Sequence, residues 1–515
     1  MTLTPYKNEP YYDLSDEANR EALQRALAEV GGRLGRSYPL IVGGKRVETD
    51  GEISSVNPAK PDQVVGRTGR ATEREADMAL ETAKRTFESW SRTEPTARAR
   101  ILLRASAIMK RRKMEFMAWE VYESGKIPSE ADAHVSEAID FLEYYAREMI
   151  RLKDGVGINA IAGEESQYFY QPMGVGVVIA PWNFPFAILT GMSAAAIVTG
   201  NTVVLKPSEH TPVLGALYAE IMEDAGLPEG VLNYLPGYGS EVGDYLVGDP
   251  RTRFISFTGS MQTGLRINEL AAKPNGQPWI KNTIIEMGGK DAMVIDESAD
   301  LDAAARDIVT SAYGYGGQKC SACSRAILHE GVYDEVLERV AEGVRSLRVA
   351  DPTDPETDFG PVVSEAQFEK VTGYIEAGQE EGELVAGGGF GDPSRGYFVE
   401  PTVFRVEEEA RVAREEIFGP VLSVLCARSF EDALRIANDT PYGLTGGVYS
   451  RNRDHLETAR REFQAGNVYF NRTITGSLVG VHPFGGFGMS GTDSKAGGPD
   501  YLPLHMLPRT VVERF

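Results

Sequence analysis

Cys320 is the residue of this sequence best suited to nucleophilic chemistry. Glycines crowd the positions before it, which lets the backbone approach a ligand closely. Lys319 directly precedes it, and a cation or a helix N-terminus beside a thiol favours the reactive thiolate. A buried structural cysteine is the alternative, and Cys323 allows a redox or zinc pair as a third interpretation. Zinc requires two further ligands, and no pair of cysteines or histidines supplies them, so we expect no metal site.

Glu286 is the carboxylate whose position best suits a general base. It stands at the end of an apolar run and is followed closely by Gly288 and Gly289. A carboxylate at the end of a strand beside glycines can act as a general base, cap a helix or form a salt bridge. The residue alone does not distinguish these three roles.

Three loops are candidates for nucleotide binding, although the usual GxGxxG fingerprint does not follow the first strand. They are residues 205–209, 236–239 and 257–260, each directly after an expected strand. Parallel sheets bind ligands at the carboxyl ends of their strands. The last loop offers backbone N–H groups and hydroxyls at a helix start, which suits a pyrophosphate. Glu209 suits ribose hydroxyls and would repel a 2′-phosphate, which favours NAD over NADP.

An α/β fold must position these residues. The first part of the chain is helical and polar: residues 72–75 form a capping box, and 97–120 and 130–152 have the helical period, as expected of helices that face solvent on one side. Short apolar runs that alternate with helical segments then predict two series of βαβ units and two parallel sheets, buried on both faces. The expected strands are residues 175–180, 202–205, 231–235 and 253–257, then 292–295, 325–329, 421–425, 446–449 and 467–470.

Bulk properties narrow the function classes further. The chain has 515 residues, 42% hydrophobic and 25% charged, which is typical of a globular protein with a sizeable core. A net charge of −22 argues against nucleic acid and anionic membrane surfaces as partners. We see neither a secretory signal nor an apolar run of about 18 residues. Three cysteines are too few for a disulfide framework, so a cytoplasmic location is expected.

Seven motifs together resemble the aldehyde dehydrogenase superfamily, and they occur in that family's order. The similarity extends from about residue 40 to the C-terminus, and the absent glycine fingerprint fits, because this family binds its cofactor without it. The motifs are PWNFP at 181–185, KPS at 206–208, FTGS at 257–260, EMGGK at 286–290, GQKC at 317–320, EIFGP at 416–420 and PFGG at 483–486.

The resemblance implies a role for each matching residue. Cys320 is then the nucleophile, Glu286 the base that activates water, and Asn183, together with the Cys320 N–H, the oxyanion hole. NAD is implied as the cofactor, with Lys206 and Glu209 at the adenosine ribose. The residues that the resemblance assigns to the cofactor are Ile179, Pro181, Trp182, Lys206, Ser208, Glu209, Gly239, Phe257, Thr258, Gly259, Ser260, Gly288, Glu416 and Phe418.

The resemblance also implies a division of the chain. Residues 1–155 and 173–286 are expected to form a helical extension and an NAD-binding domain. The NAD-binding domain and the catalytic domain are each expected to be Rossmann-like, with an open parallel sheet. Residues 287–490 then form the catalytic domain. Residues 156–172 and 491–515 are expected to pair as a small β excursion through which the chain forms a homodimer or a higher homo-oligomer.

A narrower resemblance lies in the C-terminal stretch. NRTITGSLVG at 471–480 and SGTDSKAGGPDYL at 490–502 are similar to the group that oxidises L-glutamate γ-semialdehyde, derived from 1-pyrroline-5-carboxylate, to L-glutamate in proline and arginine breakdown. A turn with two N–H groups and a hydroxyl suits the α-carboxylate of such a substrate. The residues expected to bind this small-molecule substrate are Phe184, Ser321, Gly476, Ser477 and Phe484.

Three alternatives remain beside this interpretation. The first is a related dehydrogenase of another ω-semialdehyde, such as succinate semialdehyde, which would be preferred if a succinate-type substrate had the higher kcat/KM. A CoA-acylating member of the family would generally lack the base, whereas Glu286 is present. A catalytically silent scaffold on the same fold would not need the set Cys320, Glu286 and Asn183.

Overall fold

The first of two large sheets has five parallel strands and two antiparallel ones. The computed structural model describes residues 4–515. The first five strands in the order given below are parallel to one another, which confirms the βαβ prediction. The last two strands were not predicted, and they add an antiparallel edge. In sheet order the strands are β11 (Asn282–Glu286), β10 (Thr252–Thr258), β7 (Val175–Ile179), β8 (Thr202–Lys206), β9 (Leu232–Tyr234), β2 (Leu40–Val42) and β3 (Lys45–Val47).

Helices cover both faces of this sheet. Val177 packs in a cluster with α2 (Glu73–Trp90), whereas the next residue, Val178, packs with α6 (Ala187–Val198) on the other face. Successive side chains of a strand point to opposite faces, so a strand covered on both sides must be apolar throughout. The capping box at the start of α2 is confirmed, with Thr72 N donating to Glu75 Oε2 over 2.8 Å.

The remaining N-terminal helices are more deeply buried than the sequence indicated. The helical periods are confirmed as α3 (Pro95–Arg111), α4 (Lys113–Ser124) and α5 (Pro128–Leu152). The expectation that they face solvent was wrong for α4 and α5, because α5 is packed against α3, α4 and α6 at once. The polar residues of α5 therefore contact other segments of the chain, among them residues 9–12 and Lys319.

The second large sheet is parallel except for one edge strand, β14. Helices α10 (Leu301–Tyr313) and α11 (Tyr333–Ser346) cover one face, and α12 (Glu365–Glu381), α14 (Phe430–Asn438) and α15 (Arg453–Glu462) pack in a cluster on the other. In sheet order the strands are β14 (Glu383–Ala386), β15 (Thr402–Arg405), β16 (Val421–Ala427), β13 (Arg325–His329), β12 (Ala292–Ile295), β18 (Thr445–Tyr449) and β19 (Asn467–Phe470).

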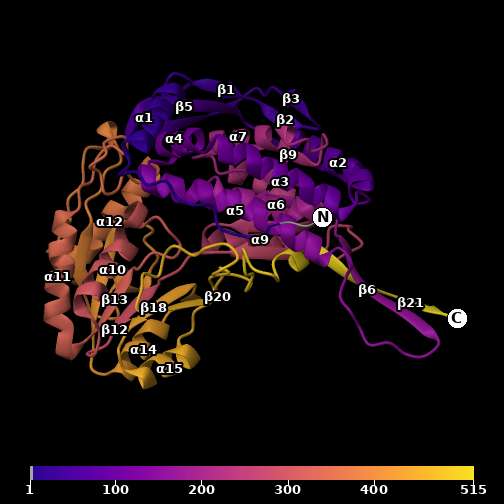
Figure 1. Ribbon diagram of the computed structural model, residues 1–515. Coiled ribbons are helices and arrows are strands. Elements are labelled where there is room, and N and C mark those ends of the chain that lie inside the picture. The colour runs from indigo at the N-terminus through magenta and orange to yellow at the C-terminus, as the bar shows by residue number, and fades with distance from the viewer. Residues whose placement is uncertain (1–3) are drawn as a thin grey trace.

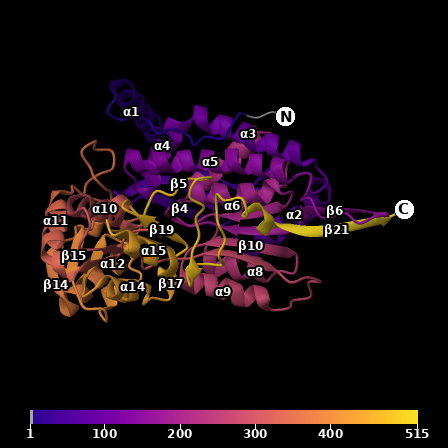
Figure 2. The same cartoon turned by 60° about the horizontal axis from the view of Figure 1, so that its bottom comes forward.

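A two-stranded arm projects from the body of the molecule (Figure 1). Strands β6 (Glu164–Pro172) and β21 (Met506–Arg514) pair antiparallel along their whole length. The paired segments are shorter than residues 156–172 and 491–515, which the sequence indicated as the strands of this excursion. After β19 the chain returns from the second sheet across the first one before it enters the arm, as the yellow trace in Figure 2 shows. Among the described residues, no helix is both long and apolar enough to cross a bilayer.

Several smaller elements were not predicted. A three-stranded sheet and helix α1 lie at the N-terminal end of the chain, and short elements flank the two large sheets. They are α1 (Glu17–Gly31), β1 (Arg36–Tyr38), β4 (Glu52–Asn57), β5 (Lys60–Gly69), α13 (Arg411–Arg414), β17 (Tyr442–Gly443) and β20 (Phe487–Gly488). Helices α7 (Pro212–Asp224) and α9 (Met261–Ala272), by contrast, are the helical segments expected after β8 and β10.

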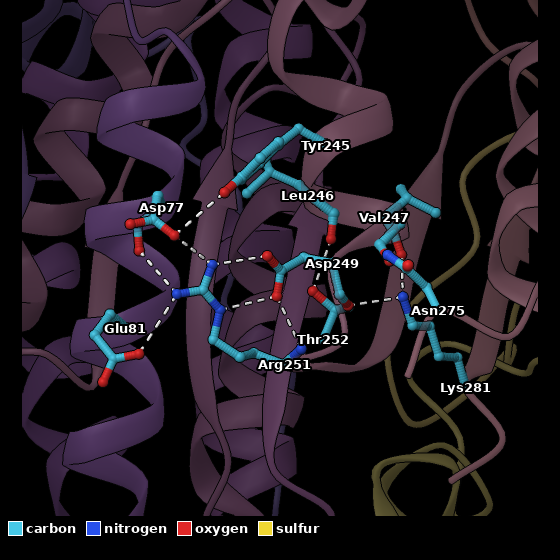
Figure 3. A network of polar contacts seen from close by, with 11 residues as sticks. Asp77, Glu81, Tyr245, Leu246, Val247, Asp249, Arg251, Thr252, Asn275 and Lys281 are labelled. Carbon is cyan, nitrogen blue, oxygen red and sulfur yellow. Dashed lines mark hydrogen bonds and ion pairs between the residues drawn. The ribbon is translucent and has the colours of Figure 1, made fainter. Parts of the chain in front are cut away.

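An ion-pair network fixes the short helix α8 (Asp244–Gly248) between α2 and β10 (Figure 3). Arg251 pairs with Asp249 over 2.7 Å and with Asp77 of α2 over 2.6 Å. Lys281 donates to two backbone carbonyls, one of α8 and one of the turn that follows it, over 2.6 and 2.8 Å. Charged groups that share several partners hold one geometry better than a single exposed pair does. The network therefore positions α8, which borders the larger cavity described below.

Candidate active site

Cys320 lies where two cavities meet. It precedes β13 at the end of a glycine-rich stretch in which Tyr315 and Gly316 have positive φ. The larger cavity has a volume of about 770 Å³ and the smaller one about 140 Å³, and both are lined by Cys320, Thr258 and Met287. A thiol at such a junction can react with a molecule in the smaller cavity beside a ligand held in the larger one.

The larger cavity is built from the carboxyl ends of the first sheet. The loops after β7, β8 and β10 meet there, and all fourteen residues predicted for the cofactor line it. Ser260 caps α9, accepting from Thr263 N over 3.3 Å, so the N-terminus of this helix opens into the cavity. Free N–H groups and the helix dipole favour an anion at that end, which fits the pyrophosphate expected from the sequence.

Lys206 and Glu209 form a pair in the wall of this cavity. Their charged groups lie 3.6 Å apart, and Lys206 is buried whereas Glu209 is half-buried. Burial lowers the pKa of Lys206, and the nearby carboxylate partly offsets that effect. The pair offers both a donor and an acceptor to ribose hydroxyls, and the Glu209 carboxylate opposes a phosphate at the same place.

The opposite wall of the larger cavity comes from the second domain. Glu416 accepts from Gly289 N over 3.1 Å, and any side chain at Gly288 would overlap its carboxylate. Phe418, whose φ is +62°, packs edge-on against Trp182 with ring centroids 5.3 Å apart. The Phe418–Trp182 contact joins the two domains beside Cys320, and the bond from Gly289 N holds Glu416 in the cavity wall, so together they fix the width of the cavity at its reactive end.

The smaller cavity contains all five residues predicted for the substrate. Phe184 and Phe484 line it together with Ser321, Gly476 and Ser477. Gly476 has a positive φ of 76°, and the Ser477 hydroxyl lies 2.6 Å from the Tyr469 hydroxyl. The cavity thus has aromatic walls along its length and hydroxyl groups near Cys320 and at the 476–477 turn.

Seven residues of α5 also line the smaller cavity, and none of them was predicted from the sequence as a site residue; His134 and Glu137 are two of them. His134 stacks on Phe184 with ring centroids 3.9 Å apart, and burial lowers its pKa well below the ordinary value, so the ring is neutral. Burial raises the pKa of Glu137 to about 8, to which the charge of Asp140 contributes. The only sequence signal was their spacing of three on a helix, which any amphipathic helix shows.

Glu286 reaches the smaller cavity from the end of β11. Ser494 Oγ donates to its Oε1 over 2.5 Å, while Oε2 is buried without a protein partner among the described residues. Burial raises the pKa of Glu286 to about 8, and the Ser494 bond and the charge of Lys495 oppose that rise. A carboxylate with such a pKa and one free oxygen can accept a proton from water near neutral pH.

The C-terminal return segment holds this carboxylate in place. Met287 N donates to Ser490 O over 2.7 Å, and Thr492 N donates to Ile285 O over 2.9 Å, so residues 490–494 lie along the end of β11. Lys495 donates to Gly466 O over 2.8 Å. Neither Ser494 nor Lys495 was predicted from the sequence as a site residue.

The surroundings of Cys320 differ from the sequence expectation. Burial raises the pKa of the thiol above its ordinary range, and the carboxylates of Asp291 and Glu286 add to this. The proposed effect of Lys319 was wrong, because its ammonium pairs with Glu130 on α5 over 2.7 Å. A bound cation or a base that takes the proton is therefore needed to form the thiolate.

Asn183 stands beside the nucleophile with its amide directed at the cysteine loop. Its Nδ2 donates to Gln318 O over 3.1 Å, and its Oδ1 accepts from Phe184 N over 3.1 Å. The side chain is buried and held from both ends. A preorganised donor of this kind can stabilise negative charge that develops on a carbonyl oxygen attacked by Cys320.

Cys323 belongs to the core of the second domain. It is 1% exposed among the apolar residues between α10 and the sheet, and its thiol lies 3.4 Å from Arg325 O. These contacts support a packing role for Cys323. Among residues 4–515, no group of three or more candidate side chains is arranged to hold a metal ion.

Known proteins resemble the chain along its whole length. The Aldehyde dehydrogenase family matches residues 46–511. The 1-pyrroline-5-carboxylate dehydrogenase of Geobacillus thermodenitrificans is 58% identical over 513 residues, which are 99% of each chain. The crystal structure of 1-pyrroline-5-carboxylate dehydrogenase from Thermus with bound NAD is 53% identical, with a TM-score of 0.98 over 100% of both chains. Proline utilization A from Bdellovibrio bacteriovorus is 42% identical, with a TM-score of 0.97 over 100% of this chain and 54% of that one.

The raised pKa of Cys320 makes a prediction for the protein without ligands. Alkylation of Cys320 by iodoacetamide should accelerate with pH up to about pH 9 without levelling off, because only the thiolate reacts. Peptide mass spectrometry of timed samples measures the rate, with the exposed Cys426 as the internal reference and the buried Cys323 as the slow one. A Cys320 rate that levels off below about pH 8 would contradict the description of this site.

Proposed function

Because the chain belongs to the aldehyde dehydrogenase family, we propose that it oxidises L-glutamate γ-semialdehyde, formed from 1-pyrroline-5-carboxylate, to L-glutamate with NAD. The observation that carries the proposal is the position of Cys320 at the junction of the two cavities. A substrate in the smaller cavity would then have its reacting carbon within reach of the thiol and of a cofactor in the larger cavity at the same time. The full-length similarity to enzymes of that name narrows the aldehyde.

The first step is the attack of the Cys320 thiolate on the aldehyde carbon. The carbon–oxygen double bond opens, and the negative charge moves to the oxygen, where Asn183 Nδ2 and the Cys320 N–H are the donors. Loss of one such donor costs on the order of 3 kcal/mol in the transition state. Asn183 suits this role because its side chain is buried and already oriented.

The second half of the reaction needs a hydride acceptor and a base. NAD bound in the larger cavity would supply the acceptor, and the residues predicted to hold it line that cavity, with the N-terminus of α9 at its wall. Loss of the hydride leaves a thioester on Cys320. Glu286 then takes a proton from water, the hydroxide adds to the thioester carbon, and the thiolate leaves as the acid forms. Glu286 Oε2, which has no hydrogen-bond partner within residues 4–515, is suited to that proton.

Substrate recognition distinguishes an amino-acid aldehyde from succinate semialdehyde. The hydroxyls of Ser321 and Ser477 and the backbone at Gly476 provide donors for a carboxylate. Glu137 provides a half-buried carboxylate in the same cavity, and a bound ammonium would restore its ionised form. Succinate semialdehyde lacks that ammonium and would leave Glu137 without a counter-ion. We therefore favour the amino acid over this alternative.

The arm supports the proposal of a homo-oligomer. It exposes apolar side chains, with Ile161, Val512 and Phe515 at 63%, 54% and 82%. An isolated two-stranded ribbon is marginally stable in water, and its free edges favour pairing with another chain. A second copy that covers the arm would bury these residues. The cytoplasmic location stays a prediction, and the three cysteines are free thiols in the structure.

The proposed reaction is tested by NADH formation from 1-pyrroline-5-carboxylate. We expect turnover with this substrate, a far lower kcat/KM with succinate semialdehyde, and loss of activity by at least about 1,000-fold in Cys320→Ala. Cys323→Ala is the matched control and should keep activity, because this thiol lies in the core. Turnover of succinate semialdehyde alone would keep Cys320 as the nucleophile but reject the proposed substrate.

The pKa of Glu286 predicts how thioester hydrolysis depends on pH. The base works when deprotonated, so the hydrolysis rate should rise through about pH 8 and be lost as the pH falls. Ser494→Ala removes a bond that lowers this pKa, so the rise should move to higher pH by about one unit. Single-turnover kinetics across pH measures both profiles.

Asp493→Asn provides a control of opposite sign for that experiment. The charge of Asp493 raises the pKa of Glu286, so its removal should move the profile to lower pH. Shifts of both variants in the same direction would contradict the assignment of Glu286 as the base.

Light scattering during gel filtration tests the arm as an interface. The wild type should have a mass of at least two 56.2 kDa chains. Val512→Arg places a charge on the exposed arm and should shift the protein toward the monomer. Leu384→Arg, on the exposed edge strand β14 of the second sheet, should not. A monomeric wild type would reject the proposal.

A further inference from the structure

The N-terminal strap, residues 6–12, crosses the outside of the smaller cavity. It precedes α1 and extends beside α5, where Figure 1 shows the indigo chain near the N label. Tyr11 belongs to the strap and lines the smaller cavity, although it is 57% exposed. The strap therefore forms part of the wall that surrounds the substrate, in addition to covering the helices below it.

Asn8 joins the strap to the loop that carries Gly476 and Ser477. Its Nδ2 donates to Val479 O over 2.9 Å and to Asp140 Oδ2 on α5 over 2.8 Å. The Tyr6 hydroxyl donates to the same Val479 carbonyl over 3.2 Å. Val479 is 4% exposed, and it lines the smaller cavity directly after Ser477 and Leu478.

The strap itself is fixed to α4 and α5. Glu9 N donates to Asp140 Oδ1 over 2.7 Å, and Tyr12 N donates to Asp132 Oδ2 over 2.6 Å. Lys113 donates to Pro10 O over 2.8 Å and pairs with Asp132 over 2.5 Å while both are buried. Charge-assisted bonds of this kind are stronger than those between neutral groups. The strap is thus a rigid support for the loop that it contacts.

The loop depends on this support. Residues 476–480 lack regular secondary structure and turn at two glycines of positive φ, Gly476 and Gly480. Gly480 packs against the rings of Tyr6 and Tyr144, and a Cβ atom there would be within 3.0 Å of both. A flexible loop holds a ligand well only when neighbouring groups fix its conformation in advance. The strap supplies part of that constraint through two hydrogen bonds to Val479 O and the ring of Tyr6, and the ring of Tyr144 on α5 adds to it.

We infer that the strap positions the 476–480 loop for the carboxylate of the substrate and so sets the preference for an amino-acid aldehyde. The inference rests on the proposed function, since it assumes that Gly476 and Ser477 bind that carboxylate. Asn8 and Tyr6 are then positioning residues, which act through the loop and do not touch the reacting atoms. Cys320, Glu286 and Asn183 are held by other segments, so the chemical step does not need the strap.

Kinetics with two aldehydes separate this role from a general structural one. Asn8→Ala and the double variant Tyr6→Phe/Asn8→Ala are compared with wild type on 1-pyrroline-5-carboxylate and on pentanal, which lacks both the carboxylate and the ammonium. We expect KM for the first to rise about tenfold, because the donors of the loop are no longer preorganised, with kcat within about twofold. The parameters for pentanal should not change.

Ser15→Ala is the matched control, because it lies in the same N-terminal segment and its hydroxyl bonds only within that segment, to Asp13. It should behave as wild type with both aldehydes. An equal change with both aldehydes, or no change with either, would overturn the inference.

Hydrogen exchange gives a measurement that does not require turnover. Backbone amides of the loop, such as Gly480 N, which donates to Gly497 O over 2.8 Å, should exchange faster in Asn8→Ala than in wild type. Unchanged exchange there would overturn the inference even if the variant were less active. A wild type that fails to oxidise 1-pyrroline-5-carboxylate would reject the proposed function, whereas the exchange result would still decide whether the strap holds the loop.

Discussion

The thiol of Cys320 has to reach two ligands at once, and this constraint determines how the two domains pack. The loops after β7, β8 and β10 form one side of the larger cavity, while Glu416 and Phe418 of the second domain form the other. The contact of Phe418 with Trp182 fixes the separation of the domains at this point, and the bond from Gly289 N holds Glu416 in the cavity wall. A shift of about 1 Å at a reacting centre can cost two orders of magnitude in rate. The packing of both domains therefore holds the Cys320 thiol in position relative to the two cavities.

Burial of titratable groups is the second condition that the site imposes. Burial raises the pKa of Glu286 to about 8 and lowers that of Lys290, four residues on, to about 7. The same burial keeps the Cys320 thiol protonated until a ligand or a base changes its surroundings. Groups with strongly shifted pKa values concentrate at functional sites. Burying a charge costs free energy, and that cost is kept mainly where the chemistry uses the shifted pKa. The return segment 490–494 limits the shift at Glu286 through the Ser494 hydroxyl.

The parts of this architecture that depend on local sequence were predictable. The capping box at Thr72 and the apolar runs that became β7, β8, β10 and β12 needed only neighbouring residues, and the strand order placed the predicted loops in one cavity. The burial of α5 was missed, because its neighbours come from three other helices. Contacts between distant residues left no local signal: Ser494 lies 208 positions from Glu286, and Asn8 lies 471 positions from Val479. The effect of Lys319 was misjudged because Glu130 neutralises it across the domain boundary.

The most direct test of the account is to stop the reaction at the thioester. Glu286→Gln should still form the covalent bond and transfer the hydride, but it lacks the base that hydrolyses the product. Mixed with NAD and 1-pyrroline-5-carboxylate, it should release about one NADH per site and then stall. Peptide mass spectrometry should find the mass of one glutamyl group on Cys320 and on no other cysteine. Continued turnover without an adduct, or an adduct on a different residue, would contradict the central claim that Cys320 and Glu286 divide the chemistry between them.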